Sequence, residues 1–205
     1  MQFQPFYRII KEIRPIFTLD DLRVIFSSQP ISSRQLNRWQ ESGYILKLKN
    51  GVYLLEDYQN SVHPFLMANL LYQPSYVSLE SALYEYGFIP DVTQAITSIS
   101  TKKTWLTDVL NNRFDYKKIK RDCFIGYGAS KYLNYDVMMA EPEKALVDFF
   151  YFNKNRLKNK SQIDGLRFNY ENLKQKVDKE KLRHYTALFN SETLNDLIKK
   201  LIARF

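Results

Sequence analysis

The sequence predicts an α+β protein whose two parts differ in the kind of secondary structure they favour. In the first sixty residues, apolar positions recur with helical spacing and are followed by a short hairpin pattern. Residues 62–152 alternate helical patterns with segments rich in β-branched residues, and the rest of the chain is rich in helix formers. We therefore predict an N-terminal domain over residues 1–57 and a mixed α+β domain over residues 62–205 that ends in helices.

Composition limits the class of protein. Of the 205 residues, 45% are apolar and 15% aromatic, which is typical of a packed globular chain. The single cysteine, Cys123, allows no intrachain disulfide and fits a reducing compartment. Charged residues such as Arg8 and Glu12 interrupt the N-terminal segment, and no apolar run reaches about 18 residues. We expect a cytoplasmic protein without a signal peptide or membrane contact.

The net charge of +8 is unevenly distributed. Residues 1–60 hold eight basic and six acidic residues (+2), residues 61–152 hold nine and ten (−1), and residues 153–205 hold thirteen and six (+7). A basic balance suits a polyanion such as nucleic acid, but it suits a solvated, lysine-rich helical surface equally well. Charge alone leaves both interpretations open.

Three helices and a hairpin are predicted in the first domain. The first helix covers residues 5–16, and Thr18 is the expected N-cap of a short second helix. Ser32, followed three residues later by Gln35, matches a capping box at the start of a third helix. Two apolar segments then flank Asn50-Gly51, at residues 45–49 and 52–55, which indicates a two-residue turn. This order of elements predicts a winged helix-turn-helix.

The third helix is expected to present polar side chains to a DNA major groove. Leu36 and Trp39 fall on one face, where they would anchor the helix in the core. Arginine can pair with guanine and asparagine with adenine, while lysines on the hairpin would contact phosphates. The predicted DNA-binding residues are Ser33, Arg34, Asn37, Arg38, Lys47, Lys49 and Asn50. A winged helix that contacts only protein is the alternative.

The second domain is predicted to mix helices and strands. Helical patterns cover residues 63–71 and 78–86, the latter ending at Gly87, and Pro142 begins an apolar helix that runs to Phe152. Four short strands are predicted, at residues 95–101, 116–119, 123–127 and 135–139. Two or three helices are expected after residue 153.

Two basic clusters in this domain give only weak indications of function. Residues 101–104, Thr-Lys-Lys-Thr, would suit a phosphate, an acidic partner or a small effector, although a solvated loop is the favoured interpretation. Lysine and arginine at positions 117, 118, 120 and 121 are interpreted as an exposed strand edge protected against aggregation.

One set of residues could indicate a catalytic role. Asp91, Asp115 and Lys117 resemble the spaced carboxylates and lysine of metal-dependent nucleases, but the spacing is loose and Asp91 follows a proline where a turn is expected. His63 and His184 are far apart and lack companions at metal-ligand spacing, and no glycine-rich phosphate loop is present. We therefore expect no catalytic residue, no metal and no cofactor, with a nuclease as the least favoured alternative.

Several segments resemble the AbiEi family, the antitoxins of type IV abortive-infection systems. They are residues 17–55, residues 76–83 (YVSLESAL) with 86–90 (YGFIP), residues 96–104 and residues 140–146 (AEPEKAL). The resemblance implies an autorepressor whose winged helix binds repeats in its own promoter. It also implies a C-terminal domain that counteracts a nucleotidyltransferase-like toxin without requiring direct contact.

The predicted winged helix is only weakly basic and carries acids at Asp20, Asp21 and Glu41. Few phosphate contacts would make the affinity of one copy for DNA low. We expect help from the basic C-terminal third or from a second copy, and predict cooperative binding of two copies to paired half-sites.

Overall fold

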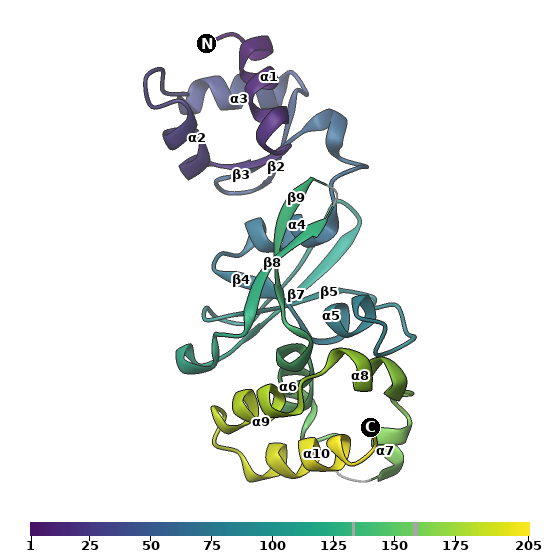
Figure 1. The fold of residues 1–205 in the computed structure, drawn as a ribbon. Helices are drawn as coiled ribbons and strands as arrows, with labels where there is room; N and C mark the ends of the chain where they lie inside the picture. The colour runs from purple at the N-terminus through teal and green to yellow at the C-terminus, as the bar shows by residue number, and fades with distance from the viewer. Residues whose placement is uncertain (133, 158–159) are drawn as a thin grey trace.

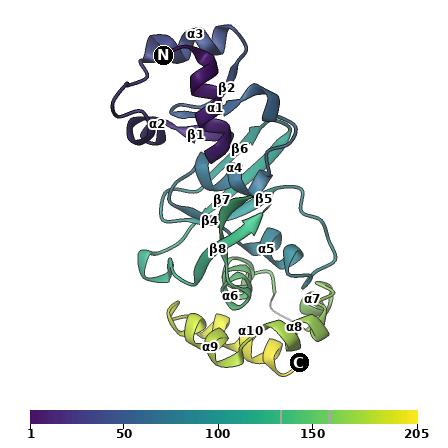
Figure 2. The same ribbon diagram turned by 45° about the horizontal axis from the view of Figure 1, so that its top comes forward.

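The computed structural model in Figure 1 describes residues 1–132, 134–157 and 160–205. Over these residues the chain is a mixed α+β protein with two sheets and ten α-helices, which confirms the predicted class. The two sheets follow one another along an elongated molecule, with α1 to α3 at one end and α7 to α10 at the other (Figures 1 and 2). No helix of the described residues has the length and apolar character needed to cross a membrane.

The N-terminal unit, residues 1–57, contains three helices and three strands. They are α1 (Phe3–Ile13), β1 (Ile16–Thr18), α2 (Leu19–Ile25), α3 (Ser33–Glu41), β2 (Ile45–Lys49) and β3 (Val52–Leu55). The hairpin strands have the predicted bounds, and β3 lies between β2 and β1 in an antiparallel sheet. The first helix ends at Ile13 and not at residue 16, because Ile16 enters β1 and pairs with Leu54.

Helix caps explain where α2 and α3 begin. The Thr18 side chain accepts a hydrogen bond from the Asp21 amide, and the Asp21 carboxylate accepts one from the Thr18 amide, which closes a capping box. Ser32 caps α3 by accepting from the Gln35 amide at 3.3 Å. The second half of the predicted box is wrong, because the Gln35 side chain donates to the Met1 carbonyl instead.

An aromatic core holds these helices together. Phe6 of α1 packs on Trp39 of α3, with ring centroids 4.4 Å apart, and on Phe17 of β1 and Phe26 after α2. The cluster consists of Phe6, Ile10, Phe17, Leu22, Phe26, Leu36, Trp39, Ile45, Tyr53 and Leu55. Three other N-terminal residues, Ile16, Val52 and Leu54, belong to the core of the following unit, so the two units pack directly on each other.

The C-terminal unit, residues 62–205, is built on a six-stranded sheet. After a 3₁₀ turn at Glu56–Tyr58, its first half contains α4 (Pro64–Leu71), β4 (Ser75–Val77), α5 (Leu79–Glu85), β5 (Ile96–Ser100), β6 (Trp105–Val109), β7 (Asn112–Lys118), a 3₁₀ turn (Arg121–Cys123), β8 (Tyr127–Tyr132), β9 (Tyr135–Ala140) and α6 (Pro142–Asn153). The strand order is β6-β7-β5-β4-β9-β8, with β5–β7 and β4–β9 parallel and the other pairs antiparallel.

Two predictions in this region are wrong. The strand expected at residues 123–127 is replaced by the 3₁₀ turn and a loop, and β8 begins only at Tyr127. The basic residues near 117 do not mark a strand edge, because β7 lies between β5 and β6 inside the sheet.

Side-chain alternation along β7 shows how the sheet is covered. Tyr116 is buried on one face and donates a hydrogen bond to the Ala68 carbonyl of α4 at 2.8 Å. Asp115 and Lys117 point to the other face, where Thr97 of β5 bonds to the Ser81 amide of α5. The α5 and α6 layer covers only part of this second face, so β7 and β6 remain open there.

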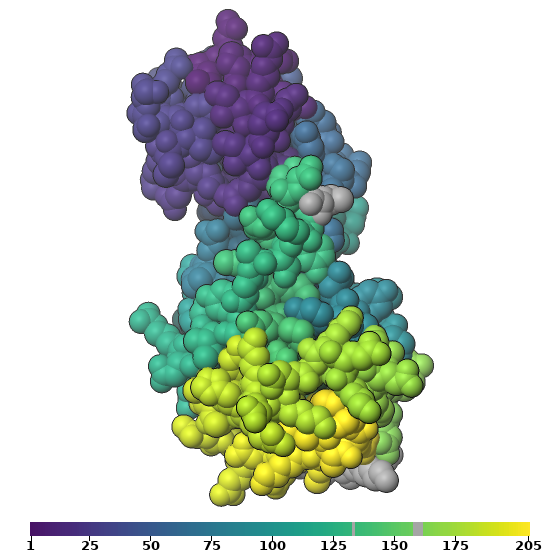
Figure 3. Space-filling model, in the orientation of Figure 1, coloured from purple at the N-terminus to yellow at the C-terminus, as the bar shows by residue number. Residues whose placement is uncertain are grey.

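In the described residues after 153, four helices close the chain, where two or three were expected: α7 (Lys160–Asp164), α8 (Tyr170–Lys176), α9 (Lys179–Ala187) and α10 (Glu192–Ile202). Helices α9 and α10 pack on α6 and on each other. Figure 3 shows them as a lobe at the end of the molecule opposite the N-terminal unit.

Candidate nucleic-acid interface

Helix α3 presents a polar face that the protein itself does not use. Leu36 and Trp39 are 2% and 5% exposed, which confirms their predicted place in the core. The predicted DNA-binding residues on the opposite side, Ser33, Arg34, Asn37 and Arg38, are all exposed. Among the described residues, none of these four side chains has a hydrogen-bond or ion-pair partner. The donors of this face are therefore free to bind an external ligand.

The hairpin divides its predicted residues between solvent and the C-terminal unit. Lys47 is exposed and lines a hollow with Gln40 of α3, whereas Asn50 is exposed at the hairpin turn beside Asp20 of α2. Lys49 is half-buried, and its ammonium donates to the Leu71 carbonyl and lies 5.3 Å from the ring centroid of Trp105. Burial, together with the nearby charge of Lys102, lowers the pKa of Lys49. Lys49 therefore joins the two units, and the other six predicted residues are exposed.

Two acids of the N-terminal unit, Asp20 and Asp21, are engaged away from α3, whereas Glu41 is exposed on α3 itself. Partial burial would raise the pKa of Asp21, but hydrogen bonds from Thr18 and the Arg14 guanidinium keep it below its ordinary value. Asp20 forms an exposed ion pair with Arg23 at 2.7 Å. The modest net charge of this unit thus conceals two unpaired arginines, Arg34 and Arg38, on one helical face.

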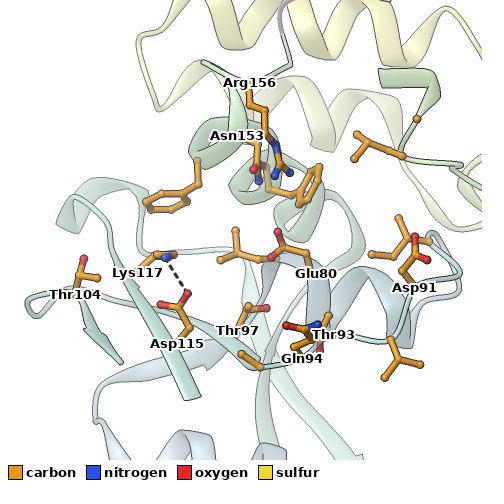
Figure 4. A pocket seen from close by; sticks show the side chains of 18 residues that line it. Glu80, Asp91, Thr93, Gln94, Thr97, Thr104, Asp115, Lys117, Asn153 and Arg156 are labelled. Atoms are coloured by element: carbon orange, nitrogen blue, oxygen red, sulfur yellow. Dashed lines mark hydrogen bonds and ion pairs between the residues drawn. The ribbon is translucent and has the colours of Figure 1, made fainter. Parts of the chain in front are cut away.

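The three residues of the nuclease hypothesis line one pocket but do not form a metal site. Figure 4 places Asp91 and Asp115 on opposite sides of the pocket. Asp91 is bound to Arg167, and Asp115 pairs with Lys117 at 2.8 Å, so both carboxylates already have cationic partners. No group of three or more metal-ligating side chains occurs in the described parts of the chain.

The histidines have the structural places that the sequence indicates. His63 is the N-cap of α4, and its Nδ1 accepts from the Phe65 amide at 3.2 Å. His184 is exposed on α9. In the basic cluster at residues 101–104, Lys102 lies 5.6 Å from the ring centroid of Tyr72, and Thr104 reaches the edge of the pocket in Figure 4.

A buried polar network, which the sequence did not reveal, ties α6 to β4. The Lys144 ammonium donates to Tyr76 at 2.9 Å and to Asp148, whose carboxylate also accepts from Ser78 at 2.9 Å. All four side chains are fully buried. Burial raises the pKa of Asp148 despite the opposing effects of Lys144 and the hydrogen bonds. The network is closed to solvent and ties the packing of α6 to β4.

Three residues of this network lie in the segments on which the resemblance to AbiEi proteins was based. Tyr76 and Ser78 belong to the segment 76–83, and Lys144 to the segment 140–146. Glu141, in the latter segment, accepts a hydrogen bond from Tyr185 of α9 at 2.6 Å. These motif residues hold the C-terminal unit together.

No protein-family model matches the chain, and no curated protein sequence matches it.

Proposed function

We propose that the N-terminal unit is a winged helix-turn-helix and that the protein is a sequence-specific DNA-binding regulator of its own promoter. The carrying observation is the outer face of α3. Arg34, Asn37 and Arg38 extend from a helix anchored by buried Leu36 and Trp39, and no described residue pairs with any of the three side chains. Arginine and asparagine are the residues that read guanine and adenine in the major groove.

In this proposal the hairpin β2–β3 acts as the wing. Lys47 and Asn50 lie exposed on it, where contacts with phosphates or the minor groove would fix the helix on the duplex. Lys49 is left out of the proposed surface because the C-terminal unit already occupies its ammonium. The proposed DNA-binding residues are Ser33, Arg34, Asn37, Arg38, Lys47 and Asn50.

A second copy is the better source of additional affinity. The basic C-terminal helices lie at the far end of the molecule from α3 (Figures 1 and 3), so one straight duplex does not reach both. Two copies on paired half-sites would double the base contacts without bending the DNA. A complex of one copy with one half-site that already has full affinity would contradict this arrangement.

The antitoxin part of the proposal rests on the resemblance to AbiEi proteins. It places the gene beside one encoding a nucleotidyltransferase-like toxin, and the C-terminal unit would relieve that toxin without a stable complex. Co-expression of the toxin with residues 62–205 and with the full chain tests this part. Growth restored only by proteins that also bind the promoter would show that repression, and not antitoxin activity, is responsible.

The DNA-binding part is tested by a mobility-shift titration at near-physiological salt. The duplexes are the DNA upstream of the gene and an unrelated fragment of equal length. We expect a specific shift that the double variant Arg34→Ala/Arg38→Ala loses. The matched control, Lys199→Ala/Lys200→Ala, removes the same charge from exposed, unpaired positions on α10 and should shift like the wild type. Equal binding to both fragments would favour a protein-interaction module.

A further inference from the structure

We propose that the pocket on the open side of the six-stranded sheet binds a small zwitterionic molecule with an apolar group, of the amino-acid or short-peptide class. Its volume is about 830 Å³, and small-molecule sites typically measure about 300–1,000 Å³. The pocket lies between β5 and β7, the loop at residues 89–95 and the segment after α6 (Figure 4). The proposal goes beyond DNA binding and does not depend on it.

Two opposite charges in this pocket are left without partners. Figure 4 shows Arg156, just after α6, pointing toward Glu80 in the first turn of α5. Over the described residues, neither side chain forms a hydrogen bond or an ion pair, so the two charges do not satisfy each other. A ligand with a carboxylate for Arg156 and an ammonium for Glu80 would complete both with charge-assisted hydrogen bonds.

The remaining charges disfavour a strongly anionic ligand. Asp115 is paired with Lys117 and Asp91 with Arg167, so three carboxylates and three cations, Glu80 and Arg156 included, sum to zero. A nucleoside triphosphate would meet a single unpaired cation of the described lining and three carboxylates nearby, and like charges repel at such distances. A ligand without net charge matches the pocket.

Apolar side chains set the second requirement on the ligand. Phe149 and Phe152 of α6, with Leu79, Ile89 and Leu166, form an apolar wall beside the two free charges. Burial of a hydrocarbon or aromatic group against this wall would supply affinity that the charges alone do not give. The match is thus to a zwitterion with an apolar side chain, and not to a small ion.

Two finer features support a binding role. The side-chain Nδ2 of Asn153 donates to the Phe149 carbonyl at 2.9 Å, which leaves the side-chain Oδ1 of Asn153 free to accept from an ammonium. Leu79, at the wall of the pocket, has a φ of 58°, which residues other than glycine rarely adopt and which is often found at ligand sites.

Titration calorimetry on the full chain tests the site. The probes are L-phenylalanine and the dipeptide L-leucyl-L-phenylalanine, each up to about 10 mM, which detects dissociation constants near ~1 mM. The reference probes are the same dipeptide with its amine acetylated and its carboxylate amidated, and adenosine monophosphate. We expect a zwitterion to bind with one-to-one stoichiometry, and the blocked dipeptide to bind at least about tenfold more weakly.

Variants locate the binding. Arg156→Ala and Glu80→Gln should each weaken the zwitterion at least about tenfold, because each removes one charge-assisted contact. Arg113→Ala is the matched control, since Arg113 pairs with Asp108 on the same sheet face but does not line the pocket. Binding of neither zwitterion overturns the proposal. So does equal binding by all variants, or tighter binding of adenosine monophosphate than of the zwitterions.

Discussion

The two units of the chain use their polar side chains in opposite ways. On α3 of the N-terminal unit, Arg34 and Arg38 point outward and have no partner in the described structure. In the C-terminal unit, Lys144 and Asp148 point inward and are fully buried against each other. A free charge on a rigid surface is available for recognition, whereas a buried and paired charge contributes to specifying the fold. The comparison predicts which changes affect binding and which affect stability.

The largest effect on stability is expected in the buried network. Asp148→Ala leaves the Lys144 ammonium buried without its counter-charge, and loss of one member of a buried pair costs about 3–5 kcal/mol. Urea denaturation should show this loss in the free energy of unfolding. Because the apolar replacement of a whole pair is often tolerated, the double variant Lys144→Met/Asp148→Leu should be more stable than Asp148→Ala. A double variant that is less stable than the single would contradict this account.

The exposed arginines should behave in the reverse manner. Arg34→Ala/Arg38→Ala removes two solvated side chains and should change the free energy of unfolding by less than about 0.5 kcal/mol for each substitution. The same variant should lose specific DNA binding. A large drop in thermal stability would show that the two arginines support the fold and would remove the contrast between the units.

The hairpin lysines offer a smaller and sharper comparison, because both lie on β2. Lys49→Ala loses the Leu71 carbonyl and the aromatic contact with Trp105, and should lower stability by about 1 kcal/mol. Lys47→Ala should leave stability unchanged and reduce the slope of log affinity for DNA against log salt by about 1, as for one lost phosphate contact. If Lys49→Ala reduced the salt slope and Lys47→Ala lowered stability, Lys49 and not Lys47 would be the DNA-binding lysine.

The smallest expected effect concerns pH and the N-terminal unit. The pKa of Asp21 is lower in the folded chain than its ordinary value of 3.8. The ionised carboxylate therefore stabilises the fold above that pH, and the contribution is lost as pH falls through the lowered pKa. Denaturation midpoints measured from pH 5 downward should fall less steeply for Asp21→Asn than for the wild type. Parallel curves would show that the capping box does not contribute.

Local signals explain which elements could be predicted from the sequence. The Asn50-Gly51 turn and the helical periodicity around Trp39 depend on neighbouring residues, and the hairpin and α3 appear where they were expected. Strands β1 and β4 have three residues each, too few for a pattern, and form only because distant strands pair with them. The alternation of buried Phe114 and Tyr116 with polar neighbours on β7 indicates a strand with one buried face, but its place inside the sheet depends on pairing with β5 and β6.

The candidate sites show the same limit. Nothing local distinguishes Lys47 from Lys49, because the difference lies in Tyr72 and Trp105, which are remote in sequence. The pocket joins Glu80 to Arg156 across most of the C-terminal unit, and the segment 76–83 that contains Glu80 gives no sign of this distant partner. Sites that depend on one helix can be predicted from its sequence, whereas sites assembled from several elements require the fold.

The most direct test of the central claim is the ratio of affinities for the upstream promoter fragment and for unrelated DNA, measured by fluorescence anisotropy at one salt concentration. Each paired contact between arginine and guanine is worth about 1–3 kcal/mol of discrimination. We predict that Arg34→Ala/Arg38→Ala lowers this ratio at least about tenfold, while Lys199→Ala/Lys200→Ala leaves it unchanged. A ratio that stays the same in the α3 variant would contradict DNA recognition by this helix.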